Sequence, residues 1–566
     1  MPFRNGILLA GALFSLTNAH AQFVQQGSKL VGTPRSFNPN EGTSVAISVD
    51  GNTAIVGAPF EGNGPGAAWI FTRANGVWTQ QAKLVGIGAV DGAIGANQGF
   101  AVALSADGNT ALVGGPFDSS GLGAAWVFTR SGGTWSQQGG KLVGSGNVGG
   151  ASLGHSVALS ADGSTALLGG WADNGYVGAV WVFTNINGVW TQQGDKLVGS
   201  PYIPGTISNA PGSYVPAVQE GSSVALSEDG STAVIGGSQD NNEGALWIFT
   251  RSGGVWSQQS GKLTPADGLP GQFGSSVAIS PDGNTVLAGG PLSNGNAGGA
   301  WVFTRSGTTW SQQGPQLAGS GASGPAYQGT GVGLSGDGNT AIVGGYGDNN
   351  FIGAAWIFTR SGRAWTQQGY KLVGSGAIGG AIRQGESVAI SGDSSTAIVG
   401  GVYDDMGVGA VWIFTQPVAP EPPAPGYVSP GWGGGASQSM VFTFNDPRGW
   451  QDLDVVNILI SNFLDGRQAC YLAYSRPFNV LYLVNDAGTA LSTGLMPGGS
   501  GAIGNGQCAV SASGFSVTGS GTTLILALNI SFTPVFNGNR VIYLAARDAA
   551  DANNSGWQAM GSWAVE

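Results

Sequence analysis

Residue types that carry covalent or metal chemistry are scarce in this 566-residue chain. It has two histidines, His20 and His155, and two cysteines, Cys470 and Cys508. A zinc site takes about four Cys, His or carboxylate ligands, and general acid–base catalysis uses histidine most often. The composition therefore argues against a thiolate or imidazole metal site and against most His-based catalysis.

His155 is the one histidine expected in a mature protein, because His20 falls in an expected targeting segment. No G-x-S-x-G elbow or similar nucleophile motif accompanies His155, and a triad needs a nucleophile and an orienting acid beside the base. We expect a structural His155, no catalytic residues and a protein that is not an enzyme. Two loop carboxylates hydrolysing a polysaccharide remain the enzymatic alternative.

The two cysteines enclose a 39-residue loop and do not form a C-x-x-C pair. In an exported chain two cysteines most simply make one disulfide. We predict the bond Cys470–Cys508, which stabilises the chain by roughly 3–4 kcal/mol in the chain-entropy model.

Aromatic and acidic side chains gather in connections of variable length. The aromatic candidates, able to stack on a sugar or on a partner's side chain, are Phe60, Phe117, Trp171, Tyr346, Tyr403, and, in the longest connection, Tyr202 and Tyr214. The acidic candidates, able to attract a cation or a basic partner, are Asp348, Asp404 and Asp405. The alternatives are that the aromatics cap a central channel and that the acids are only solvated. We take these ten residues as the candidate ligand-contacting set.

These connections belong to a unit that occurs seven times, with a core such as SVALSADGNTALVGG. Its turn aspartates are Asp50, Asp107, Asp162, Asp229, Asp282, Asp337 and Asp393. Their spacing of 53 to 67 residues is typical of a four-stranded propeller blade. Strand A (SVAIS) and strand B (TAIVGG) flank an Asp-Gly turn, strand C (GAAWIFTR) carries a recurring Trp, and strand D reads WTQQxxKLVG.

The seventh unit ends at Thr415 without a strand D, and residues 23–32 (FVQQGSKLVG) match that missing strand. Pairing the two would close a ring of seven blades and remove exposed sheet edges. The variable B–C and D–A connections then emerge on one face, as a recognition surface requires. The prediction is an all-β fold, a seven-bladed β-propeller with an N-terminal strand closing the last blade.

The unit resembles the FG-GAP repeat of secreted bacterial proteins, which is similar to the integrin alpha-subunit propeller. The resemblance covers residues 23–415 and rests on seven in-register copies of G-x-SVALSADGNTALVGG-P and GAAWVFTRSGGTWSQQGxKLVGSG. It implies a propeller used for extracellular adhesion or recognition. In that family a D-x-D/N-x-D-G-x-x-D loop can hold calcium. Here the hairpin is S-x-D-G-N-T, and one carboxylate per turn cannot supply six to eight oxygens. We therefore expect no cofactor and no calcium at these turns.

The sequence predicts four segments in all, of which the repeats form the second. Residues 1–21 read as a secretory signal with an A-x-A cleavage site, and 22–415 are the propeller. Residues 416–436 read as a Pro/Gly-rich linker, and 437–566 as an immunoglobulin-like β-sandwich of about seven strands. No second long apolar run follows the signal, so we expect no transmembrane segment and a secreted or cell-surface protein.

The net charge of −11 disfavours nucleic-acid binding, which needs a basic face. The sequence favours a monomeric recognition or adhesion protein whose variable-loop face binds an extracellular protein or glycan. A lectin-like propeller that stacks glycans on loop aromatics is the main alternative, and a carboxylate-based polysaccharide hydrolase is a third.

Overall fold

The computed structural model describes residues 22–90, 95–210, 213–268, 271–417, 421–549 and 554–566. The expected signal segment, 1–21, lies outside the described residues. The described chain forms two compact units, one ending at Pro417 and one containing the residues after it. No helix in the described part is long and apolar enough to cross a membrane.

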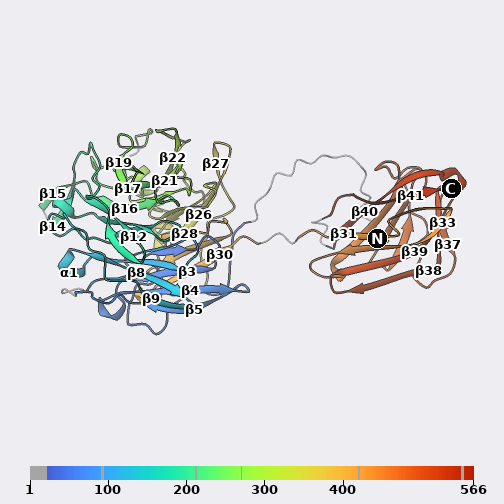
Figure 1. Ribbon diagram of the computed structural model, residues 1–566, viewed down its shortest axis with the longest axis horizontal. Helices are drawn as coiled ribbons and strands as arrows, with labels where there is room; N and C mark the ends of the chain where they lie inside the picture. The colour runs from blue at the N-terminus through green and yellow to red at the C-terminus, as the bar shows by residue number, and fades with distance from the viewer. Residues whose placement is uncertain (1–21, 91–94, 211–212, 269–270, 418–420, 550–553) are drawn as a thin grey trace. The chain divides into compact units, whose positions relative to one another are not determined.

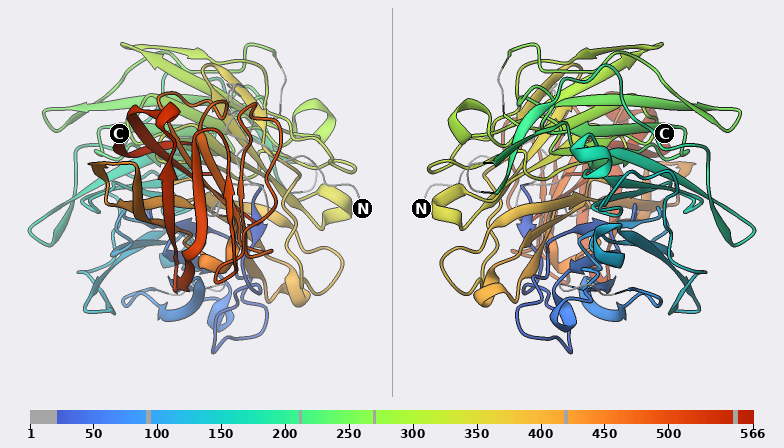
Figure 2. Two further views of the ribbon diagram at one scale, coloured as in Figure 1. Left: turned by 90° about the vertical axis from the view of Figure 1, so that its right-hand side faces the viewer. Right: turned by 90° about the vertical axis from the view of Figure 1, so that its left-hand side faces the viewer.

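The first unit is a β-propeller of seven four-stranded antiparallel sheets within the described residues (Figures 1 and 2). Blades 1 to 4 are β2(Val45–Ile47)-β3(Thr53–Ala58)-β4(Ala67–Ala74)-β5(Val77–Leu84), β6(Ala101–Leu104)-β7(Thr110–Gly115)-β8(Ala124–Ser131)-β9(Thr134–Gln137), β10(Ser156–Leu159)-β11(Thr165–Gly170)-β12(Ala179–Ile186)-β13(Val189–Gln192) and β16(Glu220–Leu226)-β17(Thr232–Gly237)-β18(Ala245–Ser252)-β19(Val255–Gln258). Blades 5 to 7 are β20(Ser276–Ile279)-β21(Thr285–Gly289)-β22(Ala300–Ser306)-β23(Thr309–Gln312), β24(Val332–Leu334)-β25(Thr340–Gly345)-β26(Ala354–Ser361)-β27(Ala364–Gln367) and β28(Gln384–Ile390)-β29(Thr396–Gly401)-β30(Ala410–Thr415)-β1(Val24–Gln25).

The first and last strands of the propeller close the ring as the repeat predicts. β1 pairs antiparallel with β30, with Val24 opposite Thr415 and Gln25 opposite Phe414. The Leu30 N–H donates to Val411 O at 2.8 Å, and the Val411 N–H donates to Leu30 O at 3.1 Å. Each innermost strand A contacts that of the next blade, including β28 against β2. The sheet edge that an open array would expose is therefore paired.

Strand D is shorter than the sequence predicts in six of the seven blades. Blade 1 reads QQAKL and has one continuous strand to Leu84. In blade 2 the extra residue of QQGGKL places Gly139 at φ 73°, and the ladder ends at Gln137 before resuming at the Ala125–Leu142 bridge. In blade 1 the pairing of β5 with β4 shifts register between Ile70 and Phe71, which marks a β-bulge. Blade 2 has one residue more at this point, and there the ladder is interrupted.

The turn aspartates stabilise their own hairpins. In blade 1, Asp50 Oδ1 accepts hydrogen bonds from Ser48 Oγ at 2.5 Å and from the Asn52 N–H at 3.0 Å. The residue before each turn aspartate links neighbouring blades through the backbone, as when the Ala106 N–H donates to Ala161 O at 2.9 Å. Pro281 occupies this position in blade 5 and has no N–H to donate.

The recurring strand-C tryptophans form the blade-to-blade core. All seven have 0% exposure: Trp69, Trp126, Trp181, Trp247, Trp301, Trp356 and Trp412. Trp126 of blade 2 packs with Ile55, Ala68 and Ile70 of blade 1. The strand-C tryptophans are therefore core residues, out of reach of a ligand on the surface.

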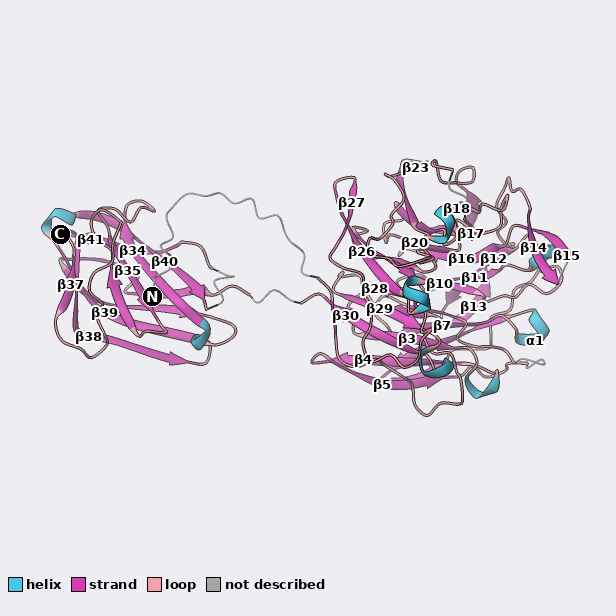
Figure 3. Cartoon of the chain, turned by 180° about the vertical axis from the view of Figure 1, so that it is seen from behind, coloured by secondary structure: helices cyan, strands magenta, loops and turns pink. Residues whose placement is uncertain are grey.

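The short helical turns of the chain lie in connections (Figure 3). They are η1(Glu61–Asn63), α1(Asp118–Gly121), α2(Asp173–Tyr176), α3(Ser293–Asn296), α4(Asp348–Phe351), η2(Asp404–Gly407), η3(Trp450–Asp452) and η4(Pro534–Phe536). The longest D–A connection forms the hairpin β14(Gly205–Ala210) and β15(Ser213–Ala217). The turns of the propeller contain residues in the left-handed region, such as Asn349 (φ 49°) and Asn350 (φ 56°).

The second unit is a β-sandwich with a shared core between its two sheets. One sheet is β31(Ala424–Ser429)-β33(Ser437–Asn445)-β39(Thr523–Phe532)-β38(Cys508–Ser520)-β37(Ala502–Gly504). The other is β32(Trp432–Gly434)-β41(Gln558–Val565)-β40(Gly538–Asp548)-β34(Leu453–Ser461)-β35(Cys470–Ser475)-β36(Val480–Leu483). The described residues of this unit thus contain eleven strands, more than the seven or so that the sequence predicts.

Two sequence predictions about this region have different outcomes. The disulfide Cys470–Cys508 is confirmed, and it joins β35 of one sheet to β38 of the other. The linker is shorter than the expected 416–436, because β31 begins at Ala424 and pairs with β33. Pro425 is tolerated there since β31 is an edge strand.

We expect that deleting residues 23–32 abolishes cooperative unfolding of the propeller, because β30 would lose its partner strand and blade 7 its edge. Calorimetry of the full chain checks this. Val24→Thr, which keeps the backbone pairing of an exposed position of β1, is the matched control and should melt like the wild type. A deletion variant that melts as sharply as the control would contradict the closure.

Candidate functional site

The B–C and D–A connections lie on one face of the propeller, called here the loop face. The B–C connection of each blade bridges the D–A connection that enters the next blade, as in Gly66 with Gln98, Gly353 with Gln384 and Gly409 with Glu41. Variable connections of neighbouring blades are therefore in contact, and a ligand on this face can touch several blades at once.

A buried acid–lysine pair fixes the loop face in six blades. The pairs are Lys29–Asp404, Lys83–Glu61, Lys141–Asp118, Lys196–Asp173, Lys262–Asp240 and Lys371–Asp348. Each acid side chain is at most 6% exposed. Lys83 lies on β5, and each of the other lysines lies four residues after strand D of its own blade, so the pair ties the B–C loop to the end of strand D. Paired charges of this kind are not free to bind a ligand.

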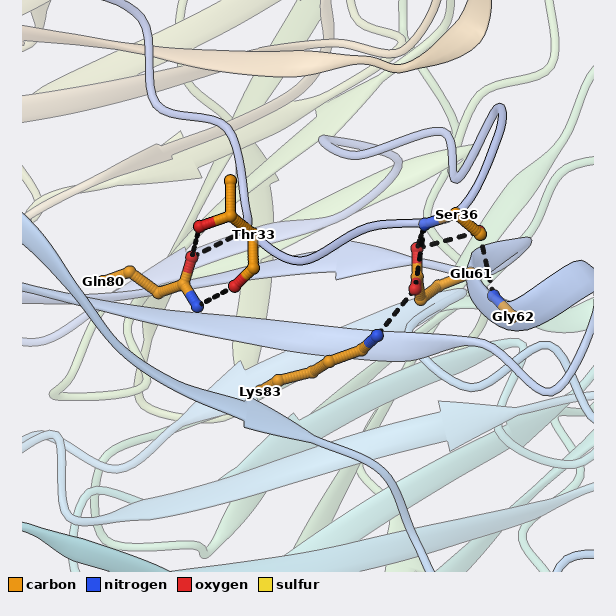
Figure 4. A network of polar contacts seen from close by, with 6 residues as sticks. All are labelled: Thr33, Ser36, Glu61, Gly62, Gln80 and Lys83. Carbon is orange, nitrogen blue, oxygen red and sulfur yellow. Dashed lines mark hydrogen bonds and ion pairs between the residues drawn. The ribbon is translucent and has the colours of Figure 1, made fainter.

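The same carboxylates accept backbone N–H groups of the D–A connection. Val90, Val148, Ser323 and Ile378 each donate to the acid of the blade that follows them, at 2.7 Å. In blade 1, Lys83 Nζ lies 2.6 Å from Glu61 Oε1, and the Ser36 N–H and Oγ donate to Glu61 Oε2 at 2.9 and 3.0 Å (Figure 4). One buried carboxylate thus holds a strand and two loops together.

This arrangement corrects part of the candidate set. Asp348 and Asp404 were expected to offer carboxylates to a cation or a basic partner, but both are fully buried and paired with lysines of their own blades. Asp405 is partly exposed, with φ 49°, and its N–H donates to Ile378 O at 2.8 Å. The acids of the loop face therefore act mainly in folding.

Blade 5 lacks both charges of the pair. Ser293 stands at the acid position and Gln316 at the lysine position, and Gln316 Nε2 donates to Ser293 Oγ at 2.7 Å. The two charges are absent together, as expected if a lone buried charge is unfavourable.

We expect Lys141→Gln to lower the free energy of unfolding of the propeller by about 3 kcal/mol, because it leaves the Asp118 carboxylate buried without its partner. Adding Asp118→Ser should restore most of the loss, since the double variant reproduces the polar pair of blade 5. Urea titration of the variants measures both effects. Equal stability of the single variant and the wild type would contradict the structural role of the pair.

A second buried side chain clamps the end of strand D. Gln384 accepts the Gly374 N–H through Oε1 at 2.6 Å and donates from Nε2 to Gly374 O at 3.0 Å. Gln98 and Gln328 make the same pair of bonds. In blades 1 and 4 the position is Glu41 and Glu220, whose Oε2 accepts the glycine N–H while Oε1 is buried without a partner among the described residues.

Burial raises the pKa of Glu41 and of Glu220 to about 8, against the opposing bonds from the Gly32 and Gly199 N–H groups. Both are therefore protonated in the folded chain at neutral pH. A protonated carboxyl can donate as the glutamine amide does.

We expect the double variant Glu41→Gln, Glu220→Gln to be more stable than the wild type at neutral pH, by roughly 3 kcal/mol for each site at pH 7. The unfolded carboxyls ionise near pH 4.5 and the folded ones near 8. Their contribution to stability is therefore full below pH 4.5 and declines as the pH rises through 8. Melting temperatures between pH 5 and 9 measure this decline.

The reverse change, Gln98→Glu, is the matched control for this titration. It should introduce the same decline of stability between pH 4.5 and 8 into a blade that lacks it. A melting temperature of the double variant that follows the wild type across the whole range would contradict the assignment.

Trp171 lies in a cluster of rings on the loop face. Trp171 packs between His155, at 5.7 Å, and Tyr176, at 5.5 Å, and Phe100 lies 4.8 Å from His155. Burial lowers the pKa of His155 to about 4, so its ring is neutral at pH 7. The expectation of a structural His155 agrees with this placement.

Tyr346 and Tyr403 are brought together around Arg383, which sequence reasoning missed. The Arg383 guanidinium lies 5.3 Å from the Tyr346 ring and 4.6 Å from the Tyr403 ring. Arg383 ends a D–A connection, whereas the two tyrosines belong to B–C connections of blades 6 and 7. Nothing in the spacing of these residues along the chain signals the contact.

The remaining candidates are spread over the loop face. Phe60 is 46% exposed and Tyr202 is 37% exposed, whereas Phe117 is half-buried. Tyr214 lies on β15, and its side chain falls outside the described part of the chain. Among the described residues, no group of three or more His, Cys, Asp or Glu side chains is placed to hold a metal ion.

Together these features define a β-propeller with an attached β-sandwich. No family model matches the chain, and no curated protein matches it. Similar solved structures include hydrazine synthase of Kuenenia stuttgartiensis (14% identity, 69% of this chain, 99% of that chain, TM-score 0.42). Also similar is a putative 6-phosphogluconolactonase of Bacteroides uniformis (16% identity, 61% of this chain, 88% of that chain, TM-score 0.42). A third is a periplasmic gluconolactonase of Pseudomonas aeruginosa (18% identity, 59% of this chain, 86% of that chain, TM-score 0.38).

These comparisons correct the expectation that the chain is not an enzyme. Two of the similar propellers are described as lactonases, and the expectation is therefore not kept. At these identities the likeness concerns the fold, and it assigns no reaction to this chain.

Proposed function

We propose that this chain is an exported recognition protein whose loop face binds an extracellular ligand. The observation that carries the proposal is the placement of exposed rings. Of the six aromatic side chains exposed on the described propeller, five lie in loop-face connections: Phe37, Phe60, Tyr202, Phe351 and Tyr403. Exposed aromatic side chains on one face can supply contacts for a ligand.

The rigidity of the loop face supports this proposal. Buried acid–lysine pairs fix the backbone of connections that differ in sequence, so exposed side chains such as Ile87 and Met406, each 78% exposed, stand on a fixed scaffold. Binding then orders few groups, which favours affinity. The resemblance to the FG-GAP repeat, the expected signal at 1–21 and the disulfide support an extracellular setting.

The exposed rings favour a glycan as the ligand. Aromatic rings stack on the apolar faces of sugars, and tyrosine adds a hydroxyl for hydrogen bonding. A protein partner would contact the same kinds of side chain. Binding to polysaccharides and to matrix proteins therefore has to be compared directly.

We expect the full chain to bind at least one member of a panel of immobilised polysaccharides and extracellular matrix proteins. The triple variant Phe60→Ser, Tyr202→Ser, Tyr403→Ser should bind at least about tenfold more weakly, because it removes exposed contact rings. The matched control is Val77→Ser, Val189→Ser, Val255→Ser, which changes apolar residues that are even more exposed, at C–D turns on the opposite face.

Equal losses in the two triple variants would contradict binding through the loop face, as would no binding to any member of the panel. Binding to matrix proteins alone would remove the glycan preference. Release of reducing ends or other products from a bound polysaccharide would make the loop face an active site.

A further inference from the structure

Arg383 differs from the other arginines of the repeat in how its side chain is satisfied. Arg73, Arg130 and Arg305 each donate from Nε to an asparagine of their own blade, at 2.8 to 3.0 Å. The Arg383 guanidinium makes no hydrogen bond among the described residues. Its nearest carboxylate oxygen is Glu386 Oε2, at 3.9 Å, and its side chain is 35% exposed. Its five N–H donors therefore remain available on the loop face.

Aromatic rings, and not hydrogen bonds, hold the guanidinium in place. It lies 4.6 Å from the Tyr403 ring, 5.3 Å from Tyr346 and 5.9 Å from Phe351. Tyr327 stacks on Tyr346 at 5.0 Å, with 14° between the planes. Cation–π contacts fix the position of an arginine without using its N–H donors.

The backbone at this position does not favour an arginine. The equivalent residues of the other blades are Asn40, Asn97, Ser152, Gln219, Gln272 and Tyr327, and all seven have φ between 54° and 62°. Asparagine tolerates this left-handed region better than a long side chain does. A long cation in blade 7 next to an aromatic ring in blade 6 is therefore a departure from the repeat that local folding does not require.

We propose that Arg383, with Tyr327, Tyr346, Phe351 and Tyr403, forms a subsite for a uronate, a sugar that carries a carboxylate, within an acidic polysaccharide. This inference rests on the proposed function of the loop face. The sugar carboxylate accepts two N–H groups of the guanidinium, a bidentate pair that arginine makes and lysine does not.

The surroundings of the guanidinium fit a sugar better than an acidic peptide. Phe351 and Tyr403 are 41% and 43% exposed, so each presents ring surface on which a pyranose can stack. The hydroxyls of Tyr327, Tyr346 and Tyr403 make no hydrogen bond among the described residues and can bind sugar hydroxyls. A glutamate side chain would use the guanidinium but neither the rings nor the phenols.

Glu386 is the competing anion at this subsite. Burial raises its pKa, and Arg383 opposes that rise. Its contact with the guanidinium is too long for a hydrogen bond, so a sugar carboxylate can replace it. Glu386→Gln removes the competitor and should leave uronate binding unchanged or tighter.

The test uses the full chain and a hexamer of galacturonate in titration calorimetry at low ionic strength. We expect the hexamer to bind, and its methyl ester, which has the same rings without the charges, to bind about tenfold more weakly. Arg383→Gln and Arg383→Lys should each weaken binding of the hexamer about tenfold. Arg363→Gln, an exposed arginine in the C–D turn of blade 6, is the matched control and should bind as the wild type does.

Each contrary outcome overturns a defined part of the proposal. Equal binding of hexamer and ester, or equal binding by Arg383→Lys and the wild type, overturns the carboxylate subsite. Tighter binding of hexaglutamate than of the hexamer replaces the sugar by an acidic peptide. If another polysaccharide binds through the loop face and the hexamer does not, the subsite fails and the proposed function stands. Melting temperatures of the Arg383 variants that match the wild type exclude misfolding as the cause of a loss.

Discussion

The buried acid–lysine pair is the interaction on which the loop face depends. A carboxylate with almost no exposure, such as Asp118, is stable inside the protein only because Lys141 and a backbone N–H satisfy it. The pair joins strand D, the B–C loop and the incoming D–A connection at one point. Connections of different length and sequence are therefore anchored at an equivalent point in each of these blades, and their outward side chains can differ from blade to blade.

Much of the propeller could be predicted because the sequence contains seven copies of one repeat unit, which can be compared with one another. A residue present in every copy, such as Trp126, had to serve the blade itself, and the Asp-Gly turns gave the hairpins. The acid–lysine pair was visible in the same comparison, since Ser293 and Gln316 replace both charges in blade 5. It was missed because nothing in the sequence says that the end of strand D meets the B–C loop. The early end of strand D was missed because a single inserted residue near Gly139 leaves the alternating pattern almost unchanged.

The sandwich and the Arg383 cluster were harder to predict, for a shared reason. Neither has a repeat to compare. An edge strand that contains Pro425 reads as linker, and short strands such as β37 and β32 carry too few residues for periodicity. The cluster combines Tyr327, Tyr346 and Tyr403 with an arginine in a left-handed conformation, and only the ring of blades brings them together. The disulfide was predictable because only two cysteines were available.

The pairing of Val24 with Thr415 also sets the order in which the molecule can form. Residues 23–32 are synthesised before the rest of the propeller, yet their partner strand β30 is among the last parts of the propeller to be synthesised. The first six blades can pack against one another earlier, but the ring of blades stays incomplete until the seventh blade has been synthesised. Contacts so distant along the chain form late, because their loop-closure entropy must be overcome first. The ring of blades therefore cannot close until β30 has been synthesised.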